Sequence, residues 1–531
     1  MQILTIYAAA TGGIFLIVVV ARVFRNVGPW SSAISVFLSR HLAYPYALDR
    51  HKFLGPWTRA GILMHLIYVT LNIFLVFFKV PALEAAGNRA GTLSLINIVF
   101  LVASLYLSNT ADLLGVSLKN CRLIHRATGW MSLALVLFHI AATVVNQERG
   151  DLAKSPRNFF AIVGAGCLGA LAILSLPPIR RLSYECFLRG HQALAIVSVY
   201  GIWRHLPSEG FLPRLYIIVA VGVLGCTSCI DIAFLFFRNG LFSGNGCPRA
   251  RISYQIEGIE NETKSTDMTL TPIKICLYLP RPITVMAGQY INLWLPSVSL
   301  RSWAQTHPFI VTSWSRGEYG MLEMVVEPRQ GLTKTLAHRA KLMGRDGFSC
   351  LALYSGPHGT NEPVDNYESV LLVASGAGIA AVIPYIKYLI HGYNTCTSHV
   401  RRVHLIWQVV SLRVAISMQD LLNDLLTDDV LDDGYILAIS VYVENGSLVR
   451  DKMPFGKHER AFLYQGAPDY PLIVSEEVSG EKIERLPNIR DDRGKSLLIA
   501  STRPDLRDTL RLIVRGHLQQ RLKMVELEYQ P

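Results

Sequence analysis

Four histidines in two apolar runs are the residues whose type and spacing could do chemistry. His125 and His139 are fourteen residues apart in the first run, and His191 and His205 are fourteen apart in the second. At about 100° per residue, fourteen steps return to within about 40° of the start, so each pair lies on one helix face, about 21 Å apart. Isolated histidines of this kind are usually polar residues that face a bundle interior. Four in register inside apolar segments instead indicate function.

The order of the apolar segments predicts how these histidines pair. One further apolar segment, Phe159–Pro178, separates the two runs. If all three segments cross a membrane, the two histidine helices are parallel. His125 is then level with His191, and His139 with His205. Two facing imidazoles at each level are the axial ligand set of a haem, so the sequence predicts two stacked haems.

Composition agrees with a membrane protein. The chain has 531 residues, of which 51% are hydrophobic and only 17% charged, with a mean hydropathy of +0.32. The apolar residues are concentrated before about residue 240, which predicts a bundle of about seven spans. The predicted spans are Leu4–Val20, Ala60–Phe78, Thr92–Leu107, Leu123–Val145, Phe159–Leu176, Glu185–Trp203 and Leu215–Phe237.

Basic residues in the connecting loops predict the orientation of these spans. The richer set comprises Arg22, Arg25, Arg40, Arg50, Lys52, Arg59, Lys119, Arg122, Arg126, Arg180, Arg181 and Arg189. The poorer set comprises Lys79, Arg89, Arg149, Lys154, Arg157, Arg204 and Arg214. By the positive-inside rule, the richer set and everything after Phe237 are cytosolic. The net charge of +12 is then explained by basic residues that flank the membrane spans, and no nucleic-acid partner is expected.

The second half of the chain changes to strand-like patterns. Alternating segments at Ile273–Leu279, Ala287–Trp294 and Leu322–Val326 predict a small antiparallel β-barrel. The apolar strand Ser369–Ala374 runs into Ser375-Gly376-Ala377-Gly378 and then a helix, which are the parts of a phosphate cradle. Further buried strands at Val403–Val410 and Ser496–Ala500 predict an open α/β sheet. The predicted domains are therefore 1–240 in the membrane, 250–365 and 366–531.

Taken together, these residues resemble the ferric reductase and NADPH oxidase superfamily, and most closely its fungal ferric-chelate (metallo)reductases. The resemblance implies a helical bundle that binds two b haems, followed by a ferredoxin-reductase-like module with an FAD-binding barrel and an NADPH-binding α/β domain. It implies haem ligation by His125, His139, His191 and His205. It implies FAD contacts at His307, Pro308, Phe309, Thr312, Ser313, Gly331, Thr333 and Gly356. It implies nicotinamide contacts at Gly376, Gly378 and Pro384.

The sequence departs from the family pattern at two places. Ala500-Ser501-Thr502-Arg503-Pro504 stands where the family commonly has Cys-Gly-Pro beside the nicotinamide ring. The family also ends on an aromatic residue over the flavin, and Tyr529 is the residue here that could serve.

Three sets of other residues carry weaker predictions. Arg122, Arg126 and Arg189 are candidates to pair with haem propionates, although their positions also fit plain membrane topology. Arg401 and Arg402 are candidates to hold a 2′-phosphate, although basic residues often flank strands. The nine cysteines are scattered and predict no disulfide framework, and we expect Cys226 and Cys229 to be small buried residues.

The predicted activity is transmembrane electron transfer from cytosolic NADPH through FAD and two haems to an acceptor on the far side. FAD is required because a hydride carries two electrons and haem accepts one. Ferric chelates or siderophores are the favoured acceptor, at the plasma membrane. The alternatives are a superoxide-generating NADPH oxidase and, in a different class, a membrane transport or structural protein without redox activity.

Overall fold

The computed structural model describes most of the chain. It covers residues 3–528 apart from 25–31, 52–54, 104–105, 147–155, 183, 208–210, 242–243, 245, 255–271, 300–301, 330, 431–434, 446–449 and 484–492. Several residues of the sequence analysis lie outside the described residues: Arg25, Lys52, Arg149, Lys154 and Tyr529. The chain divides into two compact units, residues 1–30 with 46–232, and residues 31–45 with 233–531.

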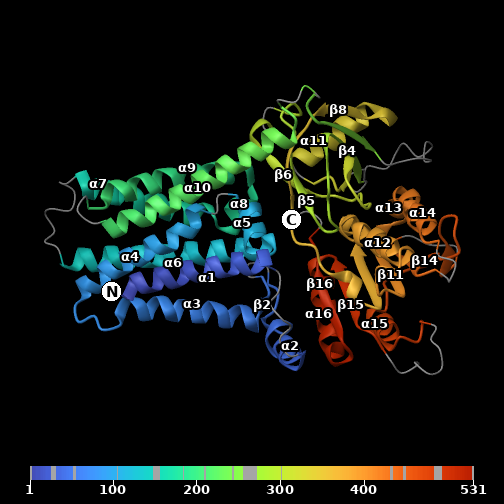
Figure 1. The fold of residues 1–531 in the computed structure, drawn as a ribbon, viewed down its shortest axis with the longest axis horizontal. Coiled ribbons are helices and arrows are strands. Elements are labelled where there is room, and N and C mark those ends of the chain that lie inside the picture. Colours follow the sequence, from blue (N-terminus) through green and yellow to red (C-terminus); the bar gives the residue numbers. More distant parts are fainter. Residues whose placement is uncertain are drawn as a thin grey trace. The chain divides into compact units, whose positions relative to one another are not determined.

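The first unit is a helical bundle (Figure 1). Its helices are α1 (Ile3–Phe24), α3 (Arg59–Phe77), α4 (Leu83–Ala103), α5 (Leu107–Leu114), α6 (Leu118–Asn146), α7 (Pro156–Leu174), α8 (Pro177–Leu182), α9 (Tyr184–His205) and α10 (Phe211–Arg238), the last of which continues into the second unit. Two short strands, β1 (Tyr46–Leu48) and β2 (Trp57–Thr58), pair ahead of α3. The most extensive packing joins α4 to α6 and α7 to α9.

Five helices in the described part of the chain are long and apolar enough to cross a membrane: α3, α4, α6, α7 and α10. Helix α9 has the required length, but Arg189, His191 and Gln192 lower its mean hydropathy. In α1, the stretch Ile3–Gly13 is apolar but shorter than these five helices. The predicted count of about seven spans therefore stays a prediction.

Two details of the predicted helices are wrong. Helix α4 begins at Leu83, nine residues before the predicted start. Hydropathy did not predict its first two turns because they contain the polar residues Asn88 and Arg89 and nearby glycines. Cys226 and Cys229 are exposed on the surface of α10 rather than buried, because that face of the helix has no protein neighbour in the described structure.

The second unit begins with two antiparallel sheets around one core. Their strands are β3 (Arg249–Tyr254), β4 (Ile273–Ile283), β5 (Tyr290–Trp294), β6 (Thr306–Ile310), β7 (Tyr319–Val326), β8 (Phe348–Leu351) and β9 (Leu353–His358). The strand orders are β7-β4-β3-β8 and β6-β5-β9. Inward-facing apolar residues of both sheets pack with helix α11 (Leu332–Leu342), which gives the barrel-like unit that alternation predicted.

The remainder is an α/β sheet in the order β13-β14-β12-β11-β10-β15-β16. The strands are β10 (Ser369–Ser375), β11 (Arg402–Ser411), β12 (Leu437–Asn445), β13 (Lys452–Pro454), β14 (Ala461–Gln465), β15 (Ser496–Ser501) and β16 (Leu522–Glu526). The helices are α12 (Ile379–Asn394), α13 (Leu412–Ser417), α14 (Gln419–Asp428), α15 (Tyr470–Ser479) and α16 (Pro504–His517). All neighbouring strands are parallel except β13 and β14.

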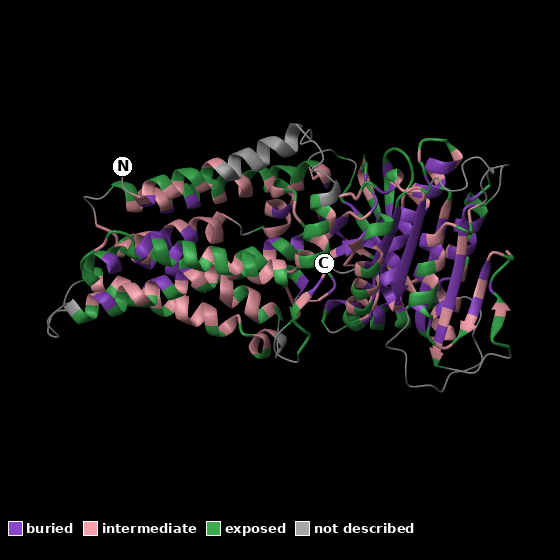
Figure 2. Cartoon of the chain, turned by 90° about the horizontal axis from the view of Figure 1, so that it is seen from below, coloured by how far each residue is buried: buried purple, intermediate pink, exposed green. Residues whose placement is uncertain are grey.

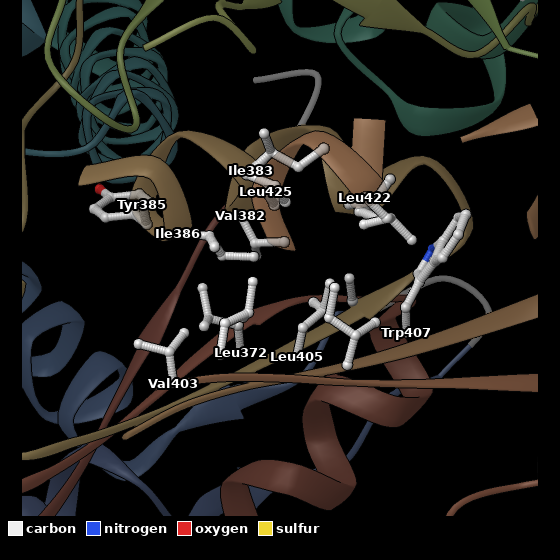
Figure 3. Close-up of a cluster of buried hydrophobic side chains, with 14 of the residues drawn as sticks. Leu372, Val382, Ile383, Tyr385, Ile386, Val403, Leu405, Trp407, Leu422 and Leu425 are labelled. Atoms are coloured by element: carbon white, nitrogen blue, oxygen red, sulfur yellow. The ribbon is translucent and has the colours of Figure 1, made fainter. Parts of the chain in front are cut away.

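Both faces of this sheet are covered, so its central strands are apolar throughout. Every residue of β10 and β15 is buried, and the sheet is the most deeply buried layer of the unit (Figure 2). Figure 3 shows α12 over one face, where Val382 and Ile386 lie above Leu372 and Leu405. Helices α15 and α16 cover the other face. The prediction that a helical bundle is followed along the chain by an antiparallel β region and then by an α/β region is confirmed.

A short stretch from the N-terminal half of the chain belongs to this second unit. It consists of α2 (Ser32–Leu38), the π-helix η1 (Ser39–Ala43) and Tyr44. Val36 and Tyr44 pack against the core between the sheet and α16. The stretch joins α1 to α3 along the chain, so its place beside the C-terminal sheet could not be read from local sequence.

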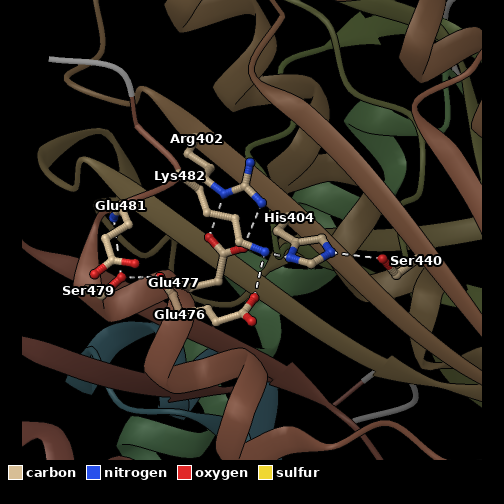
Figure 4. A network of polar contacts seen from close by, with 8 residues as sticks. All are labelled: Arg402, His404, Ser440, Glu476, Glu477, Ser479, Glu481 and Lys482. Carbon is tan, nitrogen blue, oxygen red and sulfur yellow. Dashed lines mark hydrogen bonds and ion pairs between the residues drawn. The ribbon is translucent and has the colours of Figure 1, made fainter.

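A buried charged cluster joins β11, β12 and α15 (Figure 4). The guanidinium of Arg402 donates to both carboxylate oxygens of Glu477 at 2.7 Å, and His404 Nδ1 lies 2.8 Å from the same carboxylate. The other ring nitrogen of His404 lies 3.0 Å from Ser440 Oγ. Arg402 is thus committed to Glu477 near the amino end of β11. A nucleotide binds at the carboxyl ends of parallel strands, so the interpretation of Arg402 as a 2′-phosphate ligand does not hold.

The cluster makes the stability of this unit sensitive to Glu477, which is 4% exposed. Burial by itself would raise the pKa of Glu477, but hydrogen bonds from His404 and Arg402 outweigh it and lower the pKa to about 2. Because the folded pKa lies below the ordinary value of 4.5, this stabilisation is complete above that value and is lost as the pH falls toward 2.

We predict that Glu477→Gln leaves Arg402 buried without a counter-charge and destabilises the second unit by about 3 kcal/mol. For a unit of this size, that corresponds to a melting temperature lower by roughly 6 °C or more. Thermal unfolding of the purified chain at neutral pH measures the effect. Glu476→Gln is the matched control, because the neighbouring Glu476–Lys482 pair is exposed and contributes about 1 kcal/mol at most. Equal melting temperatures for the two variants would contradict the prediction.

Candidate functional site

The first pair of predicted haem ligands meets inside the helical unit. His125 of α6 and His191 of α9 face each other with ring centres 6.3 Å apart and ring planes inclined by 48°. Two metal–nitrogen bonds of about 2 Å each, together with the half-widths of the two rings, add up to a separation of this size. Nδ1 of His191 is buried and has no hydrogen-bond partner in the described structure. The two imidazoles could therefore hold one metal ion between them, as the predicted haem would require.

The second pair is oriented by backbone carbonyls of neighbouring helices. His139 Nδ1 lies 2.9 Å from the carbonyl oxygen of Gly87 on α4. His205 Nδ1 lies 3.3 Å from the carbonyl oxygen of Arg157 on α7. A hydrogen bond to a carbonyl needs the proton on Nδ1, so each Nε2 keeps the lone pair that binds a metal.

Small residues allow the helices to approach closely enough for these bonds. Gly87 and Gly91 form a G-x-x-x-G pattern on α4, and a Cβ on Gly91 would lie 3.1 Å from His139 Nδ1. Between α7 and α9, a Cβ on Gly201 would lie 2.9 Å from the backbone nitrogen of Gly164. The sequence analysis missed these glycines as site residues, although G-x-x-x-G in an apolar helix is a readable signal.

Arginines surround both pairs. Arg126 of α6 has Arg122 on the same helix and Arg180 on α8 as electrostatic neighbours, while Arg189 donates to the Gln192 side chain at 2.8 Å. Near the second pair, Arg157 Nε donates to the His205 carbonyl oxygen at 2.6 Å. Arg204 and Arg214 each lie over an aromatic ring of the same unit. Two other basic residues of the set predicted for this side, Arg149 and Lys154, lie outside the described residues.

The predicted flavin motif lies in the barrel-like unit. His307, Pro308 and Phe309 are on β6, where Phe309 pairs with Ile291 of β5. Phe309 is 3% exposed and part of the barrel core, so it anchors the strand. His307 and Pro308 are only half-buried. Nε2 of His307 lies 3.3 Å from the Gln305 side chain.

The two predicted phosphate-contacting hydroxyls bridge β6 to β7. Thr312 Oγ1 accepts a hydrogen bond from the Val325 backbone at 3.1 Å, and Ser313 Oγ accepts one from the Glu323 backbone at 3.0 Å. Each hydroxyl keeps its own proton for donation after these bonds are made. Their contact with flavin phosphates stays a prediction, beside a demonstrated role in closing the barrel.

The remaining predicted flavin residues are at turns. Gly331 has a φ of 75° at the start of α11, and Thr333 Oγ1 accepts from the Arg329 backbone at 2.8 Å. The first amides of α11 have no side-chain cap, and such a helix start binds anionic oxygens. Gly356 has a φ of 108°, and its carbonyl oxygen accepts a hydrogen bond from Arg238.

The glycine turn after β10 is fixed by its neighbours on the sheet edge. The indole of Trp407 donates to the carbonyl oxygen of Gly376 at 2.8 Å. A Cβ on Gly378 would lie only 2.0 Å from the carbonyl oxygen of Ser501 on the adjacent strand β15. Pro384, the third predicted nicotinamide contact, lies inside α12 and is buried there. Its role toward the nicotinamide stays a prediction.

Polar groups line the same edge. The hydroxyls of Ser501 and Thr502 are buried and have no hydrogen-bond partner in the described structure. Arg503 Nη2 lies 2.7 Å from Glu444 Oε1, which also accepts from Gln408 at 2.8 Å. These residues come from the carboxyl ends of β11, β12 and β15. In an open α/β sheet this edge is where a dinucleotide binds.

Comparison with known proteins gives a consistent assignment along the chain. Residues 90–202 match the family "Ferric reductase like transmembrane component", residues 267–363 an "FAD-binding domain", and residues 367–525 a "Ferric reductase NAD binding domain". The family matches show that the chain has an FAD-binding and an NAD(P)-binding domain.

Similar curated proteins include fungal ferric reductases. The chain is 24% identical over 320 residues to "Ferric/cupric reductase transmembrane component 2" of Saccharomyces cerevisiae. The matched region makes up 59% of this chain and 41% of that protein. It is 25% identical to "Probable cell surface ferric reductase kap2" of Aspergillus oryzae, over 65% of the chain and 47% of that protein. The chain thus spans less than half the length of these relatives. A solved flavohemoglobin from Malassezia yamatoensis aligns with a TM-score of 0.36 at 14% identity, over 83% of this chain and 98% of that one.

We predict that Gly378→Ala abolishes flavin reduction by the nicotinamide coenzyme and leaves bound FAD in place, because the new Cβ would displace the turn from β15. Gly516→Ala is the matched control, because Gly516 lies near the end of α16 and a Cβ there would meet open space. Stopped-flow absorbance of the flavin measures both variants. Normal flavin reduction in Gly378→Ala would show that the coenzyme does not use this turn.

Proposed function

Because this chain belongs to the ferric reductase superfamily and is an integral membrane protein, we propose that it carries electrons across a membrane from cytosolic NADPH to ferric chelates on the far side. FAD and two haems are the proposed carriers. Flavin accepts a two-electron hydride and releases single electrons, which haem iron can accept. The observation that carries the proposal is the meeting of His125 and His191 at a separation that suits two axial ligands of one iron.

The second histidine pair supports a second haem. His139 and His205 each direct Nδ1 to a carbonyl oxygen of a neighbouring helix, which holds the ring and leaves Nε2 for the iron. Histidines fourteen residues apart lie about 21 Å apart along a helix, so haems held at these two levels would divide a hydrocarbon core of about 30 Å into shorter steps. Arg122, Arg126 and Arg189 are the proposed partners of the propionates at the first pair.

The number of membrane crossings between α3 and α10 supports a crossing by α9. Residues 32–44 and the C-terminal half belong to one unit, so α3 begins and α10 ends on the same side of the membrane. An even number of crossings must therefore lie between them. The five apolar helices from α3 to α10 would give an odd number of crossings. A crossing by α9 makes the number six, which is even. With α1, the proposed total is seven.

The same argument supports the orientation. The side shared by residues 32–44 and the C-terminal half is the side that carries the richer set of basic residues. The positive-inside rule makes it the cytosol, where NADPH is available. His125 and His191 are then near the cytosolic face, and His139 and His205 near the opposite face. We propose the plasma membrane as the location, which is in keeping with a relative named as a cell-surface reductase.

The two soluble domains have the parts that the proposed reaction needs. The barrel-like unit, proposed as residues 250–365, offers the uncapped start of α11 to the flavin pyrophosphate. The α/β unit, proposed as residues 366–531, offers the Gly376–Gly378 turn to the coenzyme. The buried hydroxyls of Ser501 and Thr502 stand where the family has cysteine, and we propose that they position the nicotinamide ring by hydrogen bonds.

We predict that His139→Ala or His205→Ala lowers the haem content from two to one per chain, because each variant removes one axial ligand of the same haem. Pyridine haemochrome absorbance and flavin content of the purified protein measure this. His65→Ala is the control: His65 also lies in an apolar helix, with Nδ1 bonded to the Gly61 carbonyl oxygen, but it has no part in either pair. Two haems per chain in His139→Ala would rule out the assignment.

The acceptor decides between a ferric reductase and a superoxide-generating oxidase. Ferric chelates are often anionic, and Arg157, Arg204 and Arg214 place positive charge at the end of the bundle near His205. Positive charge speeds the encounter with an anion and gives no advantage with neutral dioxygen. We therefore predict reduction of an anionic ferric chelate that slows as ionic strength rises. Superoxide production that exceeds chelate reduction in air would favour the oxidase.

A further inference from the structure

Residues 32–45, here called the clamp segment, are joined by hydrogen bonds to α16 and β16 of the C-terminal α/β sheet. The chain places this segment between α1 and α3 of the helical unit, yet it belongs with the α/β unit. It lies beside α16 and β16 (Figure 1). The two units are therefore joined by the chain at three points, after residues 30, 45 and 232, rather than at one.

Arg511 of α16 is the centre of the contact. Its Nη2 donates to the Ala43 carbonyl oxygen at 2.7 Å and its Nε to the Tyr44 carbonyl oxygen at 3.1 Å, at the end of the π-helix. Its Nη1 pairs with Glu526 of β16. The side chain is only 19% exposed, and its guanidinium lies 5.4 Å from the centre of the Tyr44 ring. One arginine thus binds the clamp segment, α16 and β16 together.

Two further bonds extend the contact. Arg515, one turn later on α16, donates to the Arg40 carbonyl oxygen at 3.1 Å. The backbone N–H of Met524 donates to the Tyr44 hydroxyl at 3.1 Å. Strand β16 is the edge of the seven-stranded sheet, so this hydroxyl satisfies an edge amide that no neighbouring strand uses. Val36 and Tyr44 add apolar contact with the core beneath α16.

We infer that the clamp segment is an intramolecular docking element: it binds the α16–β16 edge of the nucleotide-binding domain through Arg511 and keeps the reductase module in place for electron transfer to the helical unit. This inference rests on the proposed function. A second attachment raises the effective concentration of one module at another without any change in the chemistry of either. Loss of the clamp should therefore slow haem reduction and spare flavin reduction.

The test uses full-length protein in lipid nanodiscs with Arg511→Gln, and Arg507→Gln as the matched control. Arg507 is on the same helix and also pairs with Glu526, at 3.7 Å, but it makes no bond to residues 32–45 in the described structure. Hydrogen exchange of residues 36–44 and 522–526 should accelerate by about tenfold or more in Arg511→Gln, since several charged hydrogen bonds are lost. It should stay unchanged in Arg507→Gln.

Stopped-flow absorbance then separates the two electron-transfer steps. In Arg511→Gln, flavin reduction by NADPH should stay within about twofold of the wild type, while haem reduction slows by about fivefold or more. Unchanged haem reduction, or unchanged hydrogen exchange, would overturn the inference. Wild-type protein whose flavin is reduced by NADPH but whose haem is not would contradict the proposed function, and the exchange data would still decide whether residues 32–45 bind this edge.

A milder variant guards against misfolding of Arg511→Gln. Tyr44→Phe removes one hydroxyl and keeps the packed ring. The amide of Met524 should exchange faster in this variant. The amides of β16 that face β15 should stay protected. Full protection of Met524 in Tyr44→Phe would show that the Tyr44 hydroxyl does not bind the sheet edge, and would count against the clamp.

Discussion

Hydrogen bonds from two imidazoles to backbone carbonyls of neighbouring helices are the interactions on which the packing of the apolar bundle depends. A polar group without a partner in such surroundings costs several kcal/mol. His139 and His205 avoid that cost by bonding to Gly87 and Arg157 on the neighbouring helices. The bonds need close helix contact, and close contact needs small residues such as Gly91 and Gly201 at the crossings. The orientation of these two imidazoles and the packing of the helices are therefore one requirement, met within each of the pairs α4–α6 and α7–α9.

The C-terminal half meets a different constraint with similar means. Its parallel sheet is buried on both faces, so polar chemistry is confined to the strand ends. At the carboxyl end of β10, Gly378 allows the turn to pass against Ser501, and Trp407 holds the turn from the other side. At the amino end of β11, Arg402 and Glu477 form a closed ion pair that joins strand to helix. One end of the sheet is thus open to a ligand, and the opposite end is a structural contact.

Features with a strong local period were predictable from the sequence. The order of helical, antiparallel and α/β regions followed from hydropathy and alternation. The histidine spacing identified His125 and His191, whose ring centres the structure places 6.3 Å apart. Features that depend on a distant partner were not. Thr312 and Ser313 close the barrel through β7, and Arg402 is taken by Glu477, 75 residues later in the chain. Most of all, the place of residues 32–44 depends on Arg511, which lies more than 460 residues away in sequence.

Electron transfer through the membrane, rather than reduction on one side, is the central claim, and sealed vesicles test it most directly. Purified protein is reconstituted so that NADPH has access to the C-terminal half, and a membrane-impermeant ferric chelate is enclosed on the other side. The account predicts NADPH-dependent formation of ferrous iron inside the vesicles, and its loss when His139 and His205 are both replaced by alanine. Ferrous iron that forms only when NADPH and chelate share one side would contradict it.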